Sequence, residues 1–399
     1  MKPMLRPGLF TLCLLFVLSA LSGCDSSSNK KLQTDMYIWQ RVWTPEVAKS
    51  AEHFAPYVSE WHLLVAEIDD KKNAQVFITK PLQASTFRKL VAVIRINGQY
   101  ALDDSTEVIQ TIEKWLATQS PHRWMALEID YDCATSQLSR YNAFLKELKT
   151  QLPMGIKLYV TALPDWMRSP ELGSLLSATD RSILQVHSVL DPKRGLFDVS
   201  LAEAWITKYA KIAPGPFDVA VPDYGSRVVW DKTGHLENIV SEQGEGLIGA
   251  EQSELEAQPN DVALLLSKLQ QRHPVSLETI VWFRMPLDGD RRIWSAATLD
   301  VVIRHEPLQV HFQFILSEDS AGAQRIQLVN DGNVDALPPV TIHLPNCQAA
   351  DGIGGYVVMH ASNSLLLRRT IARMIRVGET VPVGWTRCIQ KPEEIRVED

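Results

Sequence analysis

Residues 123–132 read Arg-Trp-Met-Ala-Leu-Glu-Ile-Asp-Tyr-Asp. From Leu127 onward, apolar and acidic side chains alternate, and this period of two predicts a β-strand with two different faces. The apolar face is expected to pack on helices. The acidic face, with Glu128, Asp130 and Asp132, then points the other way.

Seven further short β-type runs occur between residues 36 and 308, and amphipathic helical stretches separate them. The eight predicted strands are 36–42, 60–68, 90–97, 123–132, 156–163, 182–189, 217–223 and 279–285. This alternation predicts the α/β class and a (β/α)8 TIM-like barrel over residues 35–308. A doubly wound open sheet is the alternative, but no glycine-rich phosphate loop follows the first strand.

The pattern of predicted secondary structure changes at residue 309. Residues 309–314 alternate with period two, and later short runs are separated by Gly, Asn, Asp and Pro. This pattern predicts a small antiparallel β-sandwich over residues 309–399. Within the barrel, the Gly- and Glu-rich stretch 230–259 after the seventh strand is expected to be a long loop above the barrel mouth.

Residues 1–23 have the features of a bacterial signal peptide. Lys2 and Arg6 precede an apolar run over 9–21, which is too short to span a bilayer. The tetrad Leu21-Ser22-Gly23-Cys24 resembles the bacterial lipobox. The resemblance implies that Cys24 receives a diacylglycerol and that the signal is cut before it.

The residues after Cys24 complete this prediction. Residues 24–34 are polar and are expected to form a flexible tether. Asp25 follows the lipidated position, which in enteric bacteria favours retention on the inner membrane over the outer membrane. We therefore expect a cell-membrane lipoprotein that faces the periplasm.

The composition of the chain limits the kinds of ligand that it is expected to bind. The net charge of −7 argues against nucleic acid, which needs a concentrated basic surface. No cofactor motif and no Cys/His cluster with zinc spacing occurs, so neither a cofactor nor a metal is expected. In an oxidising compartment, Cys347 and Cys388 are predicted to form a disulfide within the C-terminal domain, and Cys133 is predicted to be a free buried thiol.

Barrel enzymes carry their sites at the C-terminal ends of the strands, and polar residues gather there in this sequence. The predicted catalytic residues are Asp130, Asp132 and Asp223, and the predicted substrate-binding residues are Glu67, Arg95, Asn97, Glu128, Tyr224, Trp282 and Arg284. Among inward carboxylates at i, i+2 and i+4, each is about 6.6–7 Å from the next along the strand, and each raises the pKa of its neighbours. A general acid at neutral pH needs such a raised pKa.

An alternative interpretation is a structural ion network, in which Arg41, Arg95 and Arg284 neutralise the acids. His187, near the end of the sixth strand, is expected to be a core or rim residue, with a proton carrier as the alternative. Trp39, Trp166, Trp230 and Trp282 either line a sugar groove or pack in the core.

Residues 128–132, Glu-Ile-Asp-Tyr-Asp, are similar to the Asp-x-Asp-x-Glu end of the family-18 chitinase signature. The resemblance implies that Asp130 orients a substrate acetamide and that Asp132 is the general acid. Here Glu128 replaces an aspartate of the signature, and Asp132 replaces its glutamate.

A second resemblance covers most of residues 36–305. Residues 129–132, 158–163 with Trp166, and 282–286 resemble a bacterial lipoprotein family with a glycosidase-like barrel, a domain of unknown function. This resemblance implies a fold and a compartment, but no activity.

These observations predict a membrane-tethered periplasmic glycoside-hydrolase-like protein that acts on a cell-envelope or exported polysaccharide. Asp132 would protonate the glycosidic oxygen and Asp130 would stabilise the positive centre or orient an acetamide. Asp223 or Glu67 would act from the opposite wall. The alternative is a non-catalytic envelope lipoprotein that binds a glycan or a protein through the same mouth.

Overall fold

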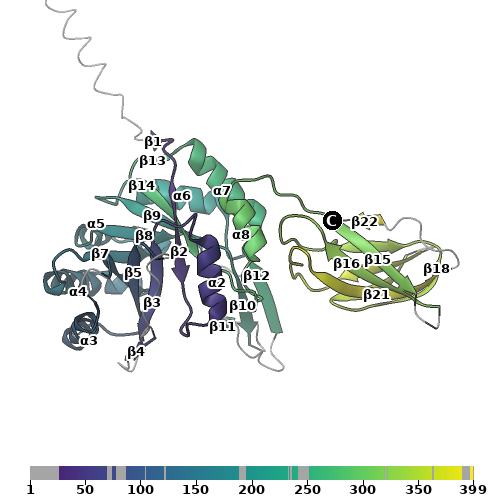
Figure 1. The fold of residues 1–399 in the computed structure, drawn as a ribbon, viewed down its shortest axis with the longest axis horizontal. Coiled ribbons are helices and arrows are strands. Elements are labelled where there is room, and N and C mark those ends of the chain that lie inside the picture. The colour runs from purple at the N-terminus through teal and green to yellow at the C-terminus, as the bar shows by residue number, and fades with distance from the viewer. Residues whose placement is uncertain are drawn as a thin grey trace, which may run out of the picture.

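The computed structural model contains two bodies, a barrel and a C-terminal sandwich (Figure 1). It describes residues 27–69, 74–77, 87–103, 105–120, 123–187, 195–231, 233, 236–240, 251–318, 320, 322–361, 364–388 and 396–398. The predicted signal peptide and Cys24 lie outside the described residues. No described helix has the length and apolar character needed to cross a membrane.

Eight parallel strands form a closed barrel, which confirms the predicted α/β barrel. In chain order they are β2 (Gln33–Ile38), β3 (Trp61–Ile68), β5 (Leu90–Ile96), β6 (Ala126–Tyr131), β7 (Lys157–Ala162), β8 (Arg181–Gln185), β9 (Phe217–Pro222) and β14 (Leu277–Phe283). Strand β2 pairs with both β3 and β14 and so closes the sheet. Strand β4 (Ala74–Val76) adds to β3 in the antiparallel sense.

Helices surround the barrel. They are α2 (Pro45–Phe54), α3 (Thr106–Ala117), α4 (Leu138–Gln151), α5 (Leu172–Ser177), α6 (Val199–Tyr209), α7 (Pro259–Gln271) and α8 (Ala296–Ile303), with 3-10 turns η1 (Thr135–Gln137) and η2 (Pro164–Arg168). Local sequence sets their starts. The Thr44 hydroxyl accepts a hydrogen bond from the Val47 amide, and Asp198 caps α6 in the same way through Leu201.

Apolar side chains fill two layers. Leu127, Ile129 and Tyr131 of β6 belong to the large layer between strands and helices. The interior of the barrel holds a smaller cluster of Tyr37, Trp39, Leu64, Val91, Val93, Ala126, Tyr159, Ile183, Ala220 and Val281. The alternation predicted for β6 is therefore observed, and its acidic face points into the barrel.

Two connections differ from expectation. The stretch after β9 carries a three-stranded antiparallel sheet of β10 (Gly225–Trp230), β11 (Leu236–Val240) and β12 (Glu251–Glu256) instead of a structureless loop. Strand β1 (Ser27–Ser28) pairs with β13 (His273–Pro274), and β2 already begins at Gln33. The described part of the predicted tether is therefore ordered against the barrel, because its main chain finds a pairing partner there.

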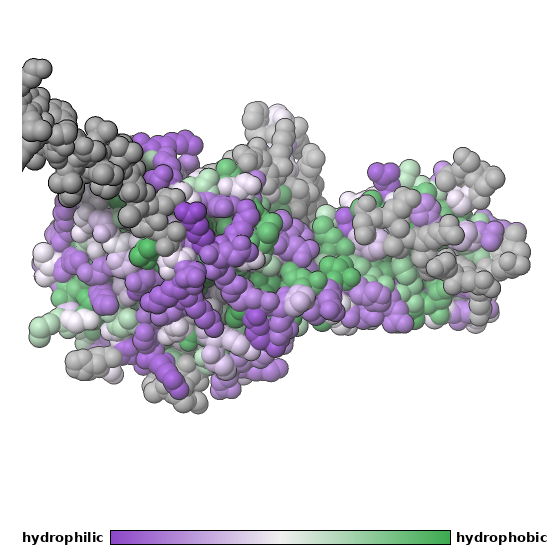
Figure 2. Space-filling view, turned by 90° about the horizontal axis from the view of Figure 1, so that it is seen from above, coloured by the Kyte–Doolittle hydropathy of each residue, from purple (hydrophilic) through white to green (hydrophobic). Residues whose placement is uncertain are grey.

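The C-terminal domain consists of two four-stranded antiparallel sheets, in agreement with the predicted sandwich. One sheet contains β15 (Phe312–Glu318), β16 (Gln324–Asn330), β21 (Thr380–Cys388) and β18 (Cys347–Gly352). The other contains β19 (Tyr356–Ala361), β20 (Ser364–Arg369), β17 (Thr341–Leu344) and β22 (Arg396–Glu398). Figure 2 shows the sandwich as a separate lobe beside the barrel.

Hydrogen bonds hold the sandwich to the segment after β14. The Asp335 carboxylate accepts bonds from the Ser295 amide and hydroxyl. The Arg376 guanidinium donates to the carbonyl oxygens of Asp288 and Ile293. The sandwich therefore stabilises the loop that follows the last barrel strand.

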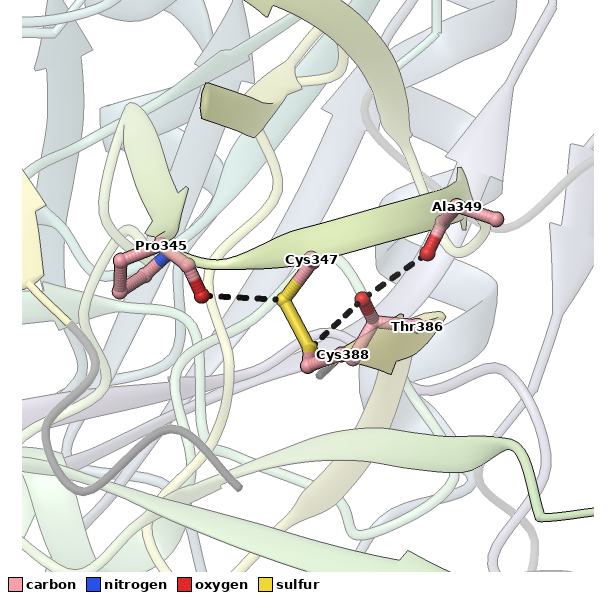
Figure 3. Close-up of a disulfide and its surroundings, with 5 residues drawn as sticks. All are labelled: Pro345, Cys347, Ala349, Thr386 and Cys388. Atoms are coloured by element: carbon pink, nitrogen blue, oxygen red, sulfur yellow. Dashed lines mark hydrogen bonds between the residues drawn. A yellow bond between two sulfur atoms is a disulfide. The ribbon is translucent and has the colours of Figure 1, made fainter. Parts of the chain in front are cut away.

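A disulfide joins Cys347 to Cys388, as predicted, across the paired strands β18 and β21 (Figure 3). Cys133 is a free and buried thiol, also as predicted. The two cysteines are 41 residues apart in the sequence. In the chain-entropy model, closing a loop of this length stabilises the fold by about 4 kcal/mol.

Replacing both Cys347 and Cys388 with Ala is expected to lower the free energy of unfolding of the sandwich by up to about 4 kcal/mol. Denaturant unfolding of the full chain, followed by Trp fluorescence, measures this loss. The Cys133→Ala variant is the control for thiol removal without disulfide loss. Equal stability of the double variant and the parent would contradict the prediction.

Candidate active site

A pocket of about 150 Å³ opens at the C-terminal ends of the barrel strands. Its lining residues are Trp39, Arg95, Asp130, Asp132, Gln185, His187, Tyr224, Phe283 and Arg284. These residues lie at or just beyond the ends of β2, β5, β6, β8, β9 and β14. The site is thus at the mouth where barrel enzymes place their chemistry.

The carboxylates of Asp130, on β6, and of Asp132, just after it, differ in depth. Asp130 is buried, and its Oδ1 accepts a hydrogen bond of 2.8 Å from the Thr161 hydroxyl and one of 3.5 Å from Gln185 Nε2. Asp132 follows the last residue of β6 and is exposed within the mouth. Asp132 is therefore the carboxyl that an entering ligand meets first.

Gly98 allows the loops after β5 and β6 to lie together. A Cβ atom at this position would lie 2.4 Å from the main-chain oxygen of Asp132, which is far inside contact distance. The absence of a side chain at Gly98 thus lets the main chain of Asp132 take its place at the rim.

The surroundings of the two acids favour their protonated forms. Burial and then the negative charge of Asp132 raise the pKa of Asp130 to about 8, against the charge of Arg95 and the hydrogen bond from Thr161. The surrounding pocket walls limit the solvation of the Asp132 carboxyl, which remains accessible from the mouth, and so raise its pKa, whereas the charge of Arg95 opposes this rise. The pair can therefore keep a proton at neutral pH, which general acid catalysis requires.

The facing wall is aromatic. His187 Nδ1 lies 3.1 Å from the Tyr224 hydroxyl, and the His187 ring stacks on Phe283 with centroids 5.6 Å apart. Burial lowers the pKa of His187 to about 3, so its imidazole is neutral at physiological pH. This wall offers hydrogen-bonding groups and a flat apolar surface without charge.

Two arginines flank the pocket. The Arg95 guanidinium lies 5.9 Å from the centroid of the Trp39 ring. Arg284 is buried and forms an ion pair with Asp290. The peptide bond between Phe283 and Arg284 is cis, and both side chains line the pocket.

Glu128 lies beneath the pocket and is fully buried. The Tyr37 hydroxyl donates to one of its oxygens at 2.5 Å, and His62 Nδ1 lies 2.5 Å from the other. Burial by itself would lower the pKa of His62, but the charges of Glu128 and Asp35 raise it to about 10. Glu128 is therefore a member of a buried ion network.

The comparisons with known proteins place the chain in a family. A family model for a domain of unknown function (DUF3142) matches residues 86–288, just over half of the chain. The chain belongs to the DUF3142 family. The matched segment contains every residue that lines the pocket except Trp39. A second model, also a domain of unknown function (DUF8456), matches residues 313–389 in the sandwich.

Several solved structures are similar to this DUF3142 protein. The spore cortex-lytic enzyme SleL of Bacillus cereus is 12% identical with a TM-score of 0.47, over 69% of this chain and 74% of that chain. A chitinase of Chromobacterium violaceum is 12% identical with a TM-score of 0.48, over 69% and 98%. The GH18 chitinase ChiB of Flavobacterium johnsoniae is 12% identical with a TM-score of 0.46, over 69% and 94%. No curated protein matches the chain.

Five of the predicted site residues of this DUF3142 chain line the pocket. They are Arg95, Asp130, Asp132, Tyr224 and Arg284. Of the arginines in the ion-network interpretation, Arg95 acts through its charge on Asp130 and Asp132, and Arg41 pairs with Glu67. Arg284 pairs with Asp290, and Glu128 is held by His62 and Tyr37.

Five predicted residues do not line the pocket, namely Glu67, Asn97, Glu128, Asp223 and Trp282. Trp282 lies on the outer face of β14, buried against Trp294 with ring centroids 6.1 Å apart, and not in the mouth. Both faces of β14 are apolar, so periodicity alone could not choose the inner one. Asp223 is fully buried and is not among the residues that line the pocket, because Tyr224, its neighbour in sequence, occupies that wall.

Glu67 and Asn97 lie in a separate depression beside the mouth. Arg41 donates two hydrogen bonds, of 2.8 and 2.9 Å, to the Glu67 carboxylate. Asn97 is exposed, and its side-chain oxygen accepts a bond from the Gln99 amide. These contacts hold Glu67 and Asn97 at the rim, away from Asp130 and Asp132. Arg95 borders both hollows.

Four pocket residues are absent from the predicted site: Trp39, Gln185, His187 and Phe283. A signal exists for two of them. Ile183 points into the barrel, so the period of two places Gln185 and His187 on the same side at the end of β8. Of the other tryptophans considered, Trp166 is buried and donates to the main-chain oxygen of Cys133.

The raised pKa of Asp130 predicts a pH-dependent stability. The folded protein keeps this proton up to about pH 8, whereas the unfolded chain releases it near pH 4. Stability from this group is thus fully present below about pH 4 and is lost as the pH rises to about 8. Melting temperatures between these limits should fall less steeply for Asp130→Asn than for the parent. Parallel curves would contradict the assignment.

Proposed function

We propose that this protein is a lipid-tethered periplasmic glycoside hydrolase that cleaves an N-acetylated cell-envelope or exported polysaccharide. The observation that carries the proposal is the Asp130–Asp132 pair, which can keep a proton in a pocket at the barrel mouth. Asp132, exposed in the mouth, protonates the glycosidic oxygen. With the shared proton on Asp132, the Asp130 carboxylate, fixed by Thr161, accepts the amide hydrogen of an acetamide and stabilises the positive centre.

The proposed nucleophile differs from the Asp223 or Glu67 carboxylate that the sequence suggested. Most glycosidases use a second carboxylate across the scissile bond. Among the described residues that line this pocket, the carboxylates are Asp130 and Asp132, and both come from β6 and the residue after it. The facing wall offers His187 and Tyr224 instead. The proposed nucleophile is therefore the carbonyl oxygen of the substrate's own acetamide, which predicts two inversions and net retention.

The size of the pocket limits what enters it. About 150 Å³ is below the roughly 300–1,000 Å³ of typical small-molecule sites, so one sugar ring or its acetamide fills it. The remaining sugars would lie across the rim. Trp39 and Phe283 provide aromatic surface for the ring inside.

The proposed compartment rests on the lipobox-like tetrad ending at Cys24 and on the cysteine pattern. A disulfide between Cys347 and Cys388 fits an oxidising compartment such as the periplasm. Asp25 favours the inner membrane.

The test is turnover of defined oligosaccharides by the purified full-length protein. N-acetylated chito-oligosaccharides, their deacetylated forms and gluco-oligosaccharides are incubated separately, and new reducing ends are measured. We expect turnover only with acetylated substrates, and we expect it to decrease once the pH is high enough to remove the proton from the Asp130–Asp132 pair. Binding of acetylated oligomers without turnover would favour a glycan-binding lipoprotein. The absence of both binding and turnover would refute the proposal.

A further inference from the structure

We propose that the floor of the barrel binds a divalent metal ion through Asp35, Glu60 and His62, independently of the function proposed above. One ligand atom from each of these residues lies within 4.8 Å of the other two. The three residues are 1%, 5% and 0% exposed, so any ion among them would be enclosed by protein.

Neighbouring strands bring these residues together. Asp35 lies on β2 and His62 on β3, and Glu60 immediately precedes β3. The Glu60 amide donates a hydrogen bond of 2.8 Å to Asp35 Oδ1. This bond fixes the Asp35 carboxylate, whose Oδ2 lies 3.8 Å from His62 Nε2. Two ligands of one ion lie at a similar spacing, since metal–ligand bonds are about 2.0–2.2 Å long.

The ligand atoms themselves are unsatisfied. Asp35 Oδ2, Glu60 Oε2 and His62 Nε2 are buried, and among the described residues none has a hydrogen-bond partner apart from the 3.8 Å ion pair between Asp35 Oδ2 and His62 Nε2. Buried polar atoms nearly always have a partner, because an unpaired one costs free energy of folding. One cation between these three atoms would satisfy all of them.

The other nitrogen of His62 is arranged as in metal sites. His62 Nδ1 lies 2.5 Å from Glu128 Oε2, and the Tyr37 hydroxyl donates to Glu128 Oε1. Histidine ligands of metals usually donate their second ring N–H to a carboxylate, which fixes the tautomer and turns the free nitrogen to the ion. Glu128 thus acts as the orienting carboxylate, and the ion would take the place of the proton that His62 Nε2 carries in the metal-free protein.

The charge of the floor also favours a cation. Asp35, Glu60 and Glu128 contribute three buried carboxylates around a single imidazole. The Lys89 ammonium lies 3.5 Å from Glu60 Oε1, but its side chain is 54% exposed. The guanidinium of Arg181 is paired with Asp218 and Glu278. A buried excess of negative charge is unfavourable unless it is paired, and a divalent ion would reduce it.

The donor set indicates the type of ion. One imidazole nitrogen and two carboxylate oxygens suit Zn²⁺ or Mn²⁺ better than Ca²⁺ or Mg²⁺, which prefer oxygen alone. The sequence predicts no metal here, because Asp35 and Glu60 are 25 residues apart and form no motif.

The experiment measures bound metal and melting temperature. Full-length protein purified in metal-free buffers is analysed by mass spectrometry for Zn and Mn, then depleted with a chelator and reloaded with Zn²⁺ or Mn²⁺. We expect about one ion per chain, a lower melting temperature after depletion, and recovery on reloading. The Glu128→Gln variant should bind the ion about 10–100-fold more weakly.

The Glu60→Gln variant is a second test at the edge of the site, in case the loss of Glu128 prevents folding. It should also bind the ion at least about 10-fold more weakly. Asp223→Asn, which neutralises a buried carboxyl outside the cluster, is the control and should keep the full metal content. Parent protein without metal, whose melting temperature does not respond to Zn²⁺ or Mn²⁺, would overturn the proposal and leave a metal-free ion network.

Discussion

Replacing Asp132 with Asn is expected to reduce glycan hydrolysis by about 10²–10⁴-fold, the usual contribution of a general acid. The exchange keeps the size of the side chain and its hydrogen-bonding atoms, and it removes only the ionisable proton. Because Asp132 is exposed in the mouth, substrate can still enter, so kcat falls more than KM rises. Initial rates on acetylated oligosaccharides measure both parameters.

The same variant separates the catalytic role from a structural one. The pKa of Asp132 is raised by the pocket walls, so its charge is unfavourable in the fold, and the melting temperature of Asp132→Asn should stay the same or rise. A structural ion-pair partner would instead leave Arg95 unanswered and lower the melting temperature. Asp69→Asn is the matched control, since Asp69 lies after β3 in the neighbouring depression. A clear fall in melting temperature, without turnover by the parent, would contradict the catalytic assignment.

The predictability of the fold differed from strand to strand. In β6 the two faces differ in chemistry, so Leu127 and Ile129 identify the helix side and Asp130 is placed inward without knowledge of the other strands. In β14 Val281, Trp282 and Phe283 are all apolar, so the alternation of polar and apolar residues cannot identify the inward face. The error at Trp282 follows from this uniformity, since the preference of tryptophan for packing and for sugar rings is the same chemistry.

The site was predictable where it depends on one strand and unpredictable where it depends on several. The position of Asp132 follows from β6 alone. The partner of Glu128 does not, because His62 is 66 residues away and reaches Glu128 across the barrel interior. The sequence also does not show how deeply a residue is buried. Asp223 and Tyr224 both follow β9, but only Tyr224 lines the pocket.

Replacing Cys24 with Ala is expected to abolish lipid attachment to the chain and to leave the signal peptide uncut. The thiol of Cys24 is the only atom of the proposed lipobox that can form the thioether to diacylglycerol, so the effect is all or none. Growth with labelled palmitate measures incorporation, and the apparent mass of the protein reports signal cleavage. Cys13→Ala is the control, because Cys13 lies within the signal but outside the tetrad that ends at Cys24.

Loss of the lipid should also weaken membrane attachment. Each buried methylene of an acyl chain contributes about 0.8 kcal/mol, and stable anchoring takes two chains, which one diacylglycerol supplies. The apolar run 9–21 of the uncut signal is too short to span a bilayer. Cys24→Ala protein should therefore shift toward the soluble fraction after cell lysis. Palmitate label on Cys24→Ala, or an unchanged mature mass, would show that Cys24 is not the anchor.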